Sequence, residues 1–160
     1  MIDKSRVVAA IVAQLQADLD LQMRAALLAR DEATSEESKA ENKYDTRAQE
    51  AAYLAEGQAR QAAELRESIS LYAALPLPQT TESAAVAVGH LVKLDGGGRT
   101  LSYFLGPRAG GAEVQVDGEL ITVVTPASPL GRQLLGARVG ATVMLPGRGK
   151  TQALRVAAIV

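Results

Sequence analysis

The stretch from residue 3 to residue 74 carries no proline and a single glycine, and this feature restricts most what the N-terminal half can form. Around that glycine, Gly57, the chain is dominated by alanine, leucine, glutamine, glutamate and arginine. These residues favour helices, whereas glycine and proline oppose them. The composition therefore predicts long α-helices in this half.

Apolar residues in this half recur at helical spacing in two stripes. The first advances in steps of three and four and consists of Val8, Val12, Leu15, Leu19, Met23 and Ala26. The second is rich in alanine and consists of Tyr44, Ala48, Ala51, Ala55, Ala59, Ala62, Ile69 and Tyr72. This spacing predicts a seam between two helices, and alanine lets the partner helix approach closely.

A polar segment at residues 31–38 separates the two stripes. Apolar seam residues are missing there, and Thr and Ser supply turn and N-cap side chains. Two helices joined by a short polar connection pack antiparallel, and about 30 residues each at ~1.5 Å per residue give a hairpin about 45 Å long. Pro76 and Pro78 end the second helix, because proline disfavours helix in the residue before it. We therefore expect a hairpin over residues 1–77 and a linker over residues 78–83.

From residue 84 the composition changes, and 13 of the 14 glycines lie beyond this residue. Runs with β character occupy residues 85–94, 101–105, 113–116, 120–124, 142–145 and 153–160. Turn signals separate them, such as Asp95 with three glycines, Asp117-Gly118 and Pro146-Gly147. One short helix is predicted among the strands, with Ser128 as N-cap, Pro129 at its first position and Gly136 as its stop. The expected fold class is α+β: an antiparallel coiled-coil hairpin, then a small antiparallel β domain at residues 84–160 with one short helix.

Composition limits the possible functions. The chain has no cysteine and one histidine, which excludes disulfide scaffolds and the usual zinc ligand sets. No apolar run approaches the ~20 residues that span a bilayer, and the N-terminus lacks a signal-peptide pattern. A cytoplasmic protein without a membrane segment is expected.

Charge is divided unevenly along the chain. Residues 1–77 hold 9 Lys+Arg and 13 Asp+Glu, whereas residues 78–160 hold 8 Lys+Arg and 5 Asp+Glu. An acidic half and a basic half suggest two different electrostatic roles. The basic residues of the second half are scattered and are not interleaved with aromatic residues, so direct sequence-specific DNA binding is not expected.

The acidic cluster of the hairpin is the one group of side chains that could bind a metal ion or take part in a reaction. It consists of Asp31, Glu32, Glu36, Glu37, Glu41 and Asp45, opposed by Lys39 and Lys43. Carboxylates at the end of a rod can hold Mg²⁺ loosely with waters, or position water near a metal of another protein. A solvated, charged hairpin end is the alternative interpretation.

The other candidate sites lack the neighbouring residues that a functional motif requires. The three glycines at residues 96–98 are not followed by the Lys-Ser/Thr of a phosphate loop and indicate a turn. His90 has no Ser, Cys or second His placed by a motif, so a structural or exposed position is expected. Because no nucleophile accompanies a base, a stand-alone enzyme is not expected.

Two segments resemble the Gre family of bacterial transcript-cleavage factors. The first runs from Glu41-Asn42 through Arg47 and Glu50 to Glu56-Gly57 and is similar to the family's acidic-Asn signature and its Glu-Gly pair. The second, residues 121–143, reads ITVVTPASPLGRQLLGARVGATV and resembles the family's C-terminal "SP…LLG…G..V" segment. The order of hairpin and β domain extends the resemblance over nearly the whole chain.

The resemblance implies an FKBP-like fold for residues 84–160 and a protein that acts on RNA polymerase in trans. The β domain would dock at the rim of the polymerase secondary channel through the segment that contains Ser128, Pro129, Arg132, Gln133 and Gly136. The hairpin would enter the channel with the tip residues Glu36, Glu37, Glu41 and Asp45. No cofactor would be tightly bound. Instead, Glu41 and Glu37 would help to hold a Mg²⁺ ion shared with polymerase, which activates water to cut backtracked RNA.

One position departs from the family pattern. Ser38 stands where the family has an Asp, three residues before the Glu of Glu-Asn. Glu37 is adjacent, but a shift of one residue rotates a helical side chain by about 100°. This leaves two alternatives. In the first, the tip is remodelled so that Glu36 or Glu37 takes the role of the missing Asp. In the second, the protein occupies the secondary channel without stimulating cleavage well.

A reading of another class is a non-catalytic interaction module that binds a different assembly or self-associates through its alanine-rich face. Because the two seams are satisfied within one chain, a monomer is expected.

Overall fold

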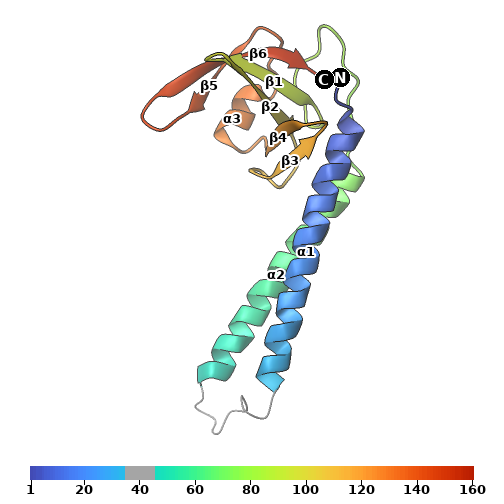
Figure 1. Ribbon diagram of the computed structural model, residues 1–160, viewed down its shortest axis with the longest axis vertical. Helices are drawn as coiled ribbons and strands as arrows, with labels where there is room; N and C mark the ends of the chain where they lie inside the picture. Colours follow the sequence, from blue (N-terminus) through green and yellow to red (C-terminus); the bar gives the residue numbers. More distant parts are fainter. Residues whose placement is uncertain (35–45) are drawn as a thin grey trace. The chain divides into compact units, whose positions relative to one another are not determined.

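The computed structural model describes residues 1–34 and 46–160 (Figure 1). Two long helices, α1 and α2, precede a six-stranded sheet with one short helix, α3, so the predicted fold class is confirmed. The elements are α1 Lys4–Thr34, α2 Thr46–Ala73, β1 Leu91–Gly96, β2 Arg99–Leu105, β3 Glu113–Val116, β4 Glu119–Val124, α3 Pro129–Leu134, β5 Thr142–Pro146 and β6 Thr151–Ile159. No helix among these described residues is long and apolar enough to cross a membrane.

The chain divides into two compact units. The sheet unit comprises Met1–Ala13 and Ser70–Val160, and the arm unit comprises Gln14–Ile69. Both boundaries fall inside the long helices, so the first turns of α1 and the last residues of α2 belong with the sheet. The arm unit holds 7 Lys+Arg and 12 Asp+Glu, a net charge of −5, and the sheet unit holds 10 and 6, a net charge of +4.

The sheet has the strand order β3-β4-β2-β1-β6-β5. It is rich in antiparallel pairs, as expected, but β2 and β4 pair in parallel, with Ser102 opposite Ile121. After β2 the chain crosses to the sheet edge as β3, and β4 then returns between β3 and β2. Because β4 is antiparallel to β3, its direction matches that of β2.

Two tight turns fix the register of neighbouring strands. Gly97 and Gly98 join β1 to β2 with φ of 60° and 79°, and Asp117 and Gly118 join β3 to β4 with φ of 53° and 79°. Left-handed conformations at both central positions are typical of type I′ turns, whose twist matches that of paired strands. The turn signals in the sequence are confirmed at both places.

One face of the sheet forms the main core with α3. Leu130 and Leu134 of α3 pack there with apolar residues of five strands and of the loop before β1, which are Val86, Val92, Leu94, Leu105, Val124, Val143, Leu154, Val156 and Ile159. Leu135, by contrast, is exposed. A helix this short with two inward leucines is held by burial rather than by its own hydrogen bonds.

The prediction of a strand from residue 85 is wrong over its first six residues. The backbone N–H of Val86 donates to the Ala137 carbonyl and its carbonyl accepts from the Gly136 N–H, both at 2.8 Å. Val86 therefore pairs with the loop after α3, whereas Gly89 and His90 form backbone hydrogen bonds with Leu105, and the strand begins at Leu91.

On the opposite face, the ends of the long helices contribute to the sheet unit. Val7 and Ile11 of α1 are completely buried, and Tyr72 of α2 is 1% exposed, with its ring centroid 6.4 Å from that of Phe104. Arg6 forms an exposed ion pair of 2.7 Å with Asp117 in the β3–β4 turn. Burial of these apolar residues, rather than the surface ion pair, holds the helix ends to the sheet.

In the arm unit, α1 and α2 lie side by side and run antiparallel (Figure 1). The buried seam is short and consists of Leu15, Leu19, Ala62 and Ser68. Beyond it the contact becomes polar, because Gln22 Nε2 donates to Gln61 Oε1 at 3.2 Å. Half-buried residues continue the spacing of three and four, namely Gln22 and Ala26 on α1 and Gln58, Leu65 and Ile69 on α2.

Several predicted seam positions are wrong. Met23 is 44% exposed, and Val7 and Ile11 are more deeply buried than Val8 and Val12. The predicted alanines Ala51, Ala55 and Ala59 are exposed. The physical reason is that glutamines occupy the distal part of the seam. A stripe traced through apolar residues alone therefore follows a helix face that does not contact the other helix. Tyr44 and the Ala48 side chain lie outside the described part.

Candidate functional site

The segment from Ser128 to Gly136 has the capped geometry that its sequence predicts. Ser128 Oγ accepts from the Gly131 N–H at 3.0 Å and donates to the Thr125 carbonyl at 2.8 Å. Pro129 occupies the first turn of α3, and Gly136 follows the helix with a φ of 82°. Such caps satisfy the free ends of a helix and fix where it starts and stops. These three residues therefore hold α3 in place and do not themselves offer reactive side chains.

Gly131 has a steric role that sequence reasoning missed. A Cβ at this position would lie 1.8 Å from the Thr125 carbonyl oxygen, so no larger residue fits without moving the backbone. A glycine inside a predicted helix is the signal that could have revealed it, because such a glycine often marks close backbone approach.

Of the predicted docking side chains, Arg132 is exposed and makes no hydrogen bond or ion pair with any residue in the described ranges. Gln133 is exposed, but its side-chain amide forms two hydrogen bonds with the backbone of Met144. Its Nε2 donates to the Met144 carbonyl at 2.9 Å, and its Oε1 accepts from the Met144 N–H at 2.8 Å. The Gln133 amide thus covers the open edge of β5, where unpaired backbone groups would otherwise face solvent. Arg138 donates to the Ser83 carbonyl at 2.7 Å.

Three large apolar residues are exposed around the same elements. Leu135 follows α3, Val139 lies in the next turn and Met144 is on the β5 edge that Gln133 joins to α3. We call Arg132, Leu135, Val139 and Met144 the α3–β5 surface. A rigid apolar surface with a free guanidinium is suited to a protein partner, since arginine and exposed apolar side chains are common at interfaces.

The predicted acidic tip lies outside the described residues. This applies to Glu36, Glu37, Glu41 and Asp45, and to Ser38, so the expected Mg²⁺ ligands have no described geometry. Among residues 1–34 and 46–160, no three His, Asp or Glu side chains gather closely enough to hold a metal ion.

His90 is structural. Its side chain is buried, and its Nδ1 accepts from the Ala87 N–H at 2.9 Å. Nδ1 is therefore unprotonated, and the buried Nε2 has no partner within the described ranges. Burial lowers the pKa of this imidazole, and the nearby Lys4 ammonium lowers it further.

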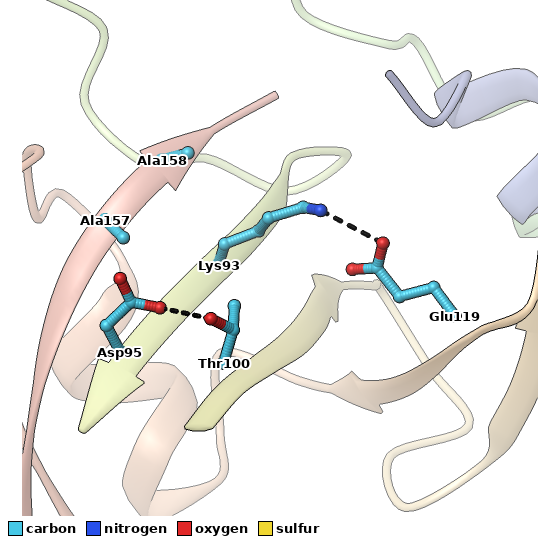
Figure 2. A pocket seen from close by; sticks show the side chains of 6 residues that line it. All are labelled: Lys93, Asp95, Thr100, Glu119, Ala157 and Ala158. Carbon is cyan, nitrogen blue, oxygen red and sulfur yellow. Dashed lines mark hydrogen bonds and ion pairs between the residues drawn. The ribbon is translucent and has the colours of Figure 1, made fainter. Parts of the chain in front are cut away.

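A shallow depression of about 460 Å³ lies on the sheet face opposite α3. It is lined by Lys93, Asp95, Thr100, Glu119, Ala157 and Ala158. Lys93 pairs with Glu119 at 3.0 Å, and Asp95 accepts from Thr100 at 2.6 Å (Figure 2). Sequence reasoning did not single out these residues, since only the fold brings Lys93 of β1 close to Glu119 of β4, across β2.

The Glu119 carboxylate is ionised in this network. Burial raises its pKa, but hydrogen bonds from Ser102 and Lys93 outweigh that effect, and the pKa lies below its ordinary value. In this part of the described chain Lys93 is paired with Glu119, and Asp95 accepts a hydrogen bond from Thr100.

No family model and no curated protein matches this chain. Among solved structures, the transcription factor Gfh1 is similar at 22% identity and a TM-score of 0.41, covering 94% of this chain and 93% of that one. Gfh1 of Thermus aquaticus gives 21% identity and a TM-score of 0.41, covering 92% of both chains. The prokaryotic transcription elongation factor GreA/GreB from Nitrosomonas europaea gives 16% identity and a TM-score of 0.35, covering 69% of this chain and 91% of that one.

Proposed function

We propose that the protein is a transcription elongation factor that binds bacterial RNA polymerase at its secondary channel. The proposal takes its function class from the sequence resemblance of residues 121–143 and of the segment from Glu41 to Gly57. The observation that carries it is the geometry of the first of these segments. Ser128 caps α3, Gly131 lets the helix lie close to the Thr125 carbonyl, and Gly136 follows the helix with a positive φ, which leaves Arg132 facing solvent beside an apolar surface.

In this proposal the two units have different tasks. The sheet unit, with a net charge of +4, docks on the channel rim through the α3–β5 surface. The arm unit, with a net charge of −5, enters the channel and carries the acidic residues toward the polymerase active site. Complementary charge at both contacts favours correct encounter and rejects wrong partners.

The tip residues decide the effect on RNA. Glu41 and Glu37 would supply carboxylates to a Mg²⁺ ion of the polymerase, and that ion would activate the water that attacks backtracked RNA. The chain would then act through the active site of its partner and not as an enzyme by itself.

Ser38 supports a second candidate function. The resembling family has an Asp at this place, and its absence removes one carboxylate from the tip. A protein with this tip occupies the channel and regulates polymerase without stimulating cleavage efficiently.

Two measurements test the proposal. Binding of the full-length chain to immobilised polymerase core enzyme tests the partner, and absence of saturable binding would favour the interaction-module reading. A cleavage assay on a stalled, backtracked elongation complex then separates the two effects. Shortened transcripts support a cleavage factor, whereas binding without shortening supports a channel occupant.

A further inference from the structure

The hairpin formed by β5 and β6 ends in an exposed two-stranded ribbon (Figure 1). β6 pairs with β1 as far as Arg155. Toward the turn, β5 and β6 continue as a ribbon that ends with the pair of Pro146 and Thr151. Residues 146–151, with the sequence PGRGKT, close the ribbon and are all exposed. We call residues 146–151 the ribbon tip.

Two glycines give the ribbon tip a tight turn. The Gly147 N–H donates to the Lys150 carbonyl at 3.1 Å, and a Cβ at Gly147 would lie 2.7 Å from that carbonyl oxygen. Gly149 has a φ of 83°, a left-handed conformation that glycine adopts without steric cost. The backbone therefore folds back sharply, and Arg148 and Lys150 are the two charged side chains that the tip presents.

These two cations lie in a part of the chain that has no acidic side chains. Residues 120–160 contain 5 Lys+Arg and no Asp or Glu. Neither Arg148 nor Lys150 forms an ion pair with any residue that the structure describes. Exposed charges more than about 10 Å apart are largely screened at ~0.1 M salt, so the local positive charge decides what the tip attracts.

The other side chains of the ribbon tip indicate the class of anion. Thr151 adds a hydroxyl group, and the tip carries no aromatic, Leu, Ile, Val or Met side chain. Protein interfaces are built around apolar and aromatic anchors, whereas contacts to phosphate use cations, hydroxyls and backbone N–H groups. The tip therefore suits a phosphate backbone better than an acidic protein surface.

The shape of the ribbon selects among nucleic acids. The major groove of B-form DNA, about 12 Å wide, admits a two-stranded β-ribbon, whereas the major groove of A-form RNA is too deep and narrow for side chains to read. Proteins that bind single strands stack the bases on aromatic side chains, and residues 105–160 contain none. Double-stranded DNA is the partner that fits these features.

We propose that the ribbon tip binds the phosphate backbone of double-stranded DNA through Arg148 and Lys150, independently of base sequence. This contact uses other residues than the α3–β5 surface does. It also goes beyond the proposed function, because it requires no polymerase. Since only two cations take part, binding is weak and depends strongly on salt.

The test is fluorescence anisotropy of a labelled DNA duplex of mixed sequence, titrated with the full chain at about 50 mM salt. The double variant Arg148→Gln with Lys150→Gln should raise the dissociation constant by about tenfold or more. It should also reduce the slope of log Kd against log salt by about 2, because two phosphate contacts are lost. Both residues are exposed, so circular dichroism of the variant should match the wild type. Arg148→Lys keeps the charge and should bind as the wild type does.

The matched control is Arg24→Gln with Arg60→Gln, two exposed arginines of the arm unit. This variant changes the net charge of the chain equally and should leave both the dissociation constant and the salt slope unchanged. Equal weakening by the two double variants would assign binding to net charge and would overturn the role of the tip.

Three further outcomes would also overturn the proposal. The first is absence of saturable binding of the wild type to the duplex at low salt. The second is tighter binding to single-stranded RNA of the same length. The third is a tip variant that binds the duplex normally but binds polymerase weakly, which would assign the tip to an acidic protein surface. Because the DNA titrations contain no polymerase, their failure leaves the proposed function untouched.

Discussion

The hydroxyl of Tyr72 donates a hydrogen bond of 2.6 Å to the carbonyl of Arg108, which ties the end of α2 to the loop between β2 and β3. Gly106 lies against the same side chain, and a Cβ at this position would come within 2.0 Å of the Tyr72 hydroxyl. Burial raises the pKa of the Tyr72 phenol. The hydrogen bond between Tyr72 and Arg108 therefore depends on the absence of a side chain at Gly106.

Gly106→Ala should therefore lower the free energy of unfolding, by about 1–3 kcal/mol, because the methyl group overpacks a closed site. Gly57→Ala is the matched contrast, since the glycine is within α2 and a Cβ there would have no atom within 4 Å besides its chain neighbours and the backbone of its own helix. That change should raise helix stability by about 0.5–1 kcal/mol. Urea denaturation measures both, and equal effects of the two changes would contradict the close contact at Tyr72.

Gln133→Ala should lower stability by about 1 kcal/mol, because Met144 loses both side-chain hydrogen bonds on the β5 edge. The uncovered edge should also increase aggregation, which light scattering during mild heating would detect. Gln115→Ala, at an exposed position of β3, is the control and should leave aggregation unchanged. Equal aggregation of the two variants would exclude edge protection by Gln133.

Stability should fall as the pH falls from about 7.5 to 5. The folded state lowers the pKa of His90 below its ordinary value of 6.5, so the unfolded chain binds a proton in a pH range where the folded chain does not. The stabilisation is thus complete above pH 6.5 and is lost as the pH falls through the folded pKa. Lys4 is the charged group that acts on this imidazole.

The measurement is the melting temperature across that range, for the wild type and for His90→Asn. The variant will be less stable at every pH through lost packing, so the slope is compared and not the absolute value. A slope that His90→Asn leaves intact would assign the effect to other groups. The lowered pKa of Glu119 acts in a separate, more acidic range, because its ordinary value is 4.5.

Arg132→Glu should weaken polymerase binding by about 1–3 kcal/mol without changing stability, because the guanidinium is exposed and would meet an acidic partner group. Arg99→Glu, an equal charge reversal at the exposed start of β2, should have a smaller effect. Competition binding against the wild type at two salt concentrations compares them. Normal binding by a folded Arg132→Glu protein would remove this residue from the interface.

Glu41→Ala should abolish any cleavage stimulation while leaving polymerase affinity unchanged, because docking is assigned to the α3–β5 surface. Ser38→Asp, which restores the carboxylate of the resembling family, should raise transcript cleavage. The assay is RNA shortening in a backtracked elongation complex. If neither change alters cleavage, the tip is a solvated end.

Local signals in the sequence were sufficient for most of the fold. Pro76, the glycine-rich turns and the Ser128–Pro129 pair each act on their own neighbours, so they predict where helices and strands end. The short helix α3 and its cap were predicted correctly for this reason.

Features that depend on distant partners were not predicted. The Lys93–Glu119 ion pair joins strands that are separated in the sheet by β2, and no spacing in the sequence indicates it. The seam through Gln22 was missed because glutamine is polar, yet its amide pairs with that of Gln61 across the hairpin. The role of the acidic tip is predicted from the sequence alone, because Glu41 lies outside the described residues.

The burial of Tyr72 also makes the protein suitable for label-free spectroscopy. The chain has no tryptophan and four tyrosines, so its near-ultraviolet signal is not masked by indole. Tyr72 is enclosed beside Phe104 in the sheet unit, whereas Tyr53 is open to solvent in the arm unit. A soluble quencher should reach Tyr53 and spare Tyr72, and alkaline titration should ionise the Tyr72 phenol late because burial raises its pKa. In a variant without Tyr44 and Tyr103, fluorescence can thus follow the attachment of α2 to the sheet through Tyr72 and the solvent exposure of the arm through Tyr53.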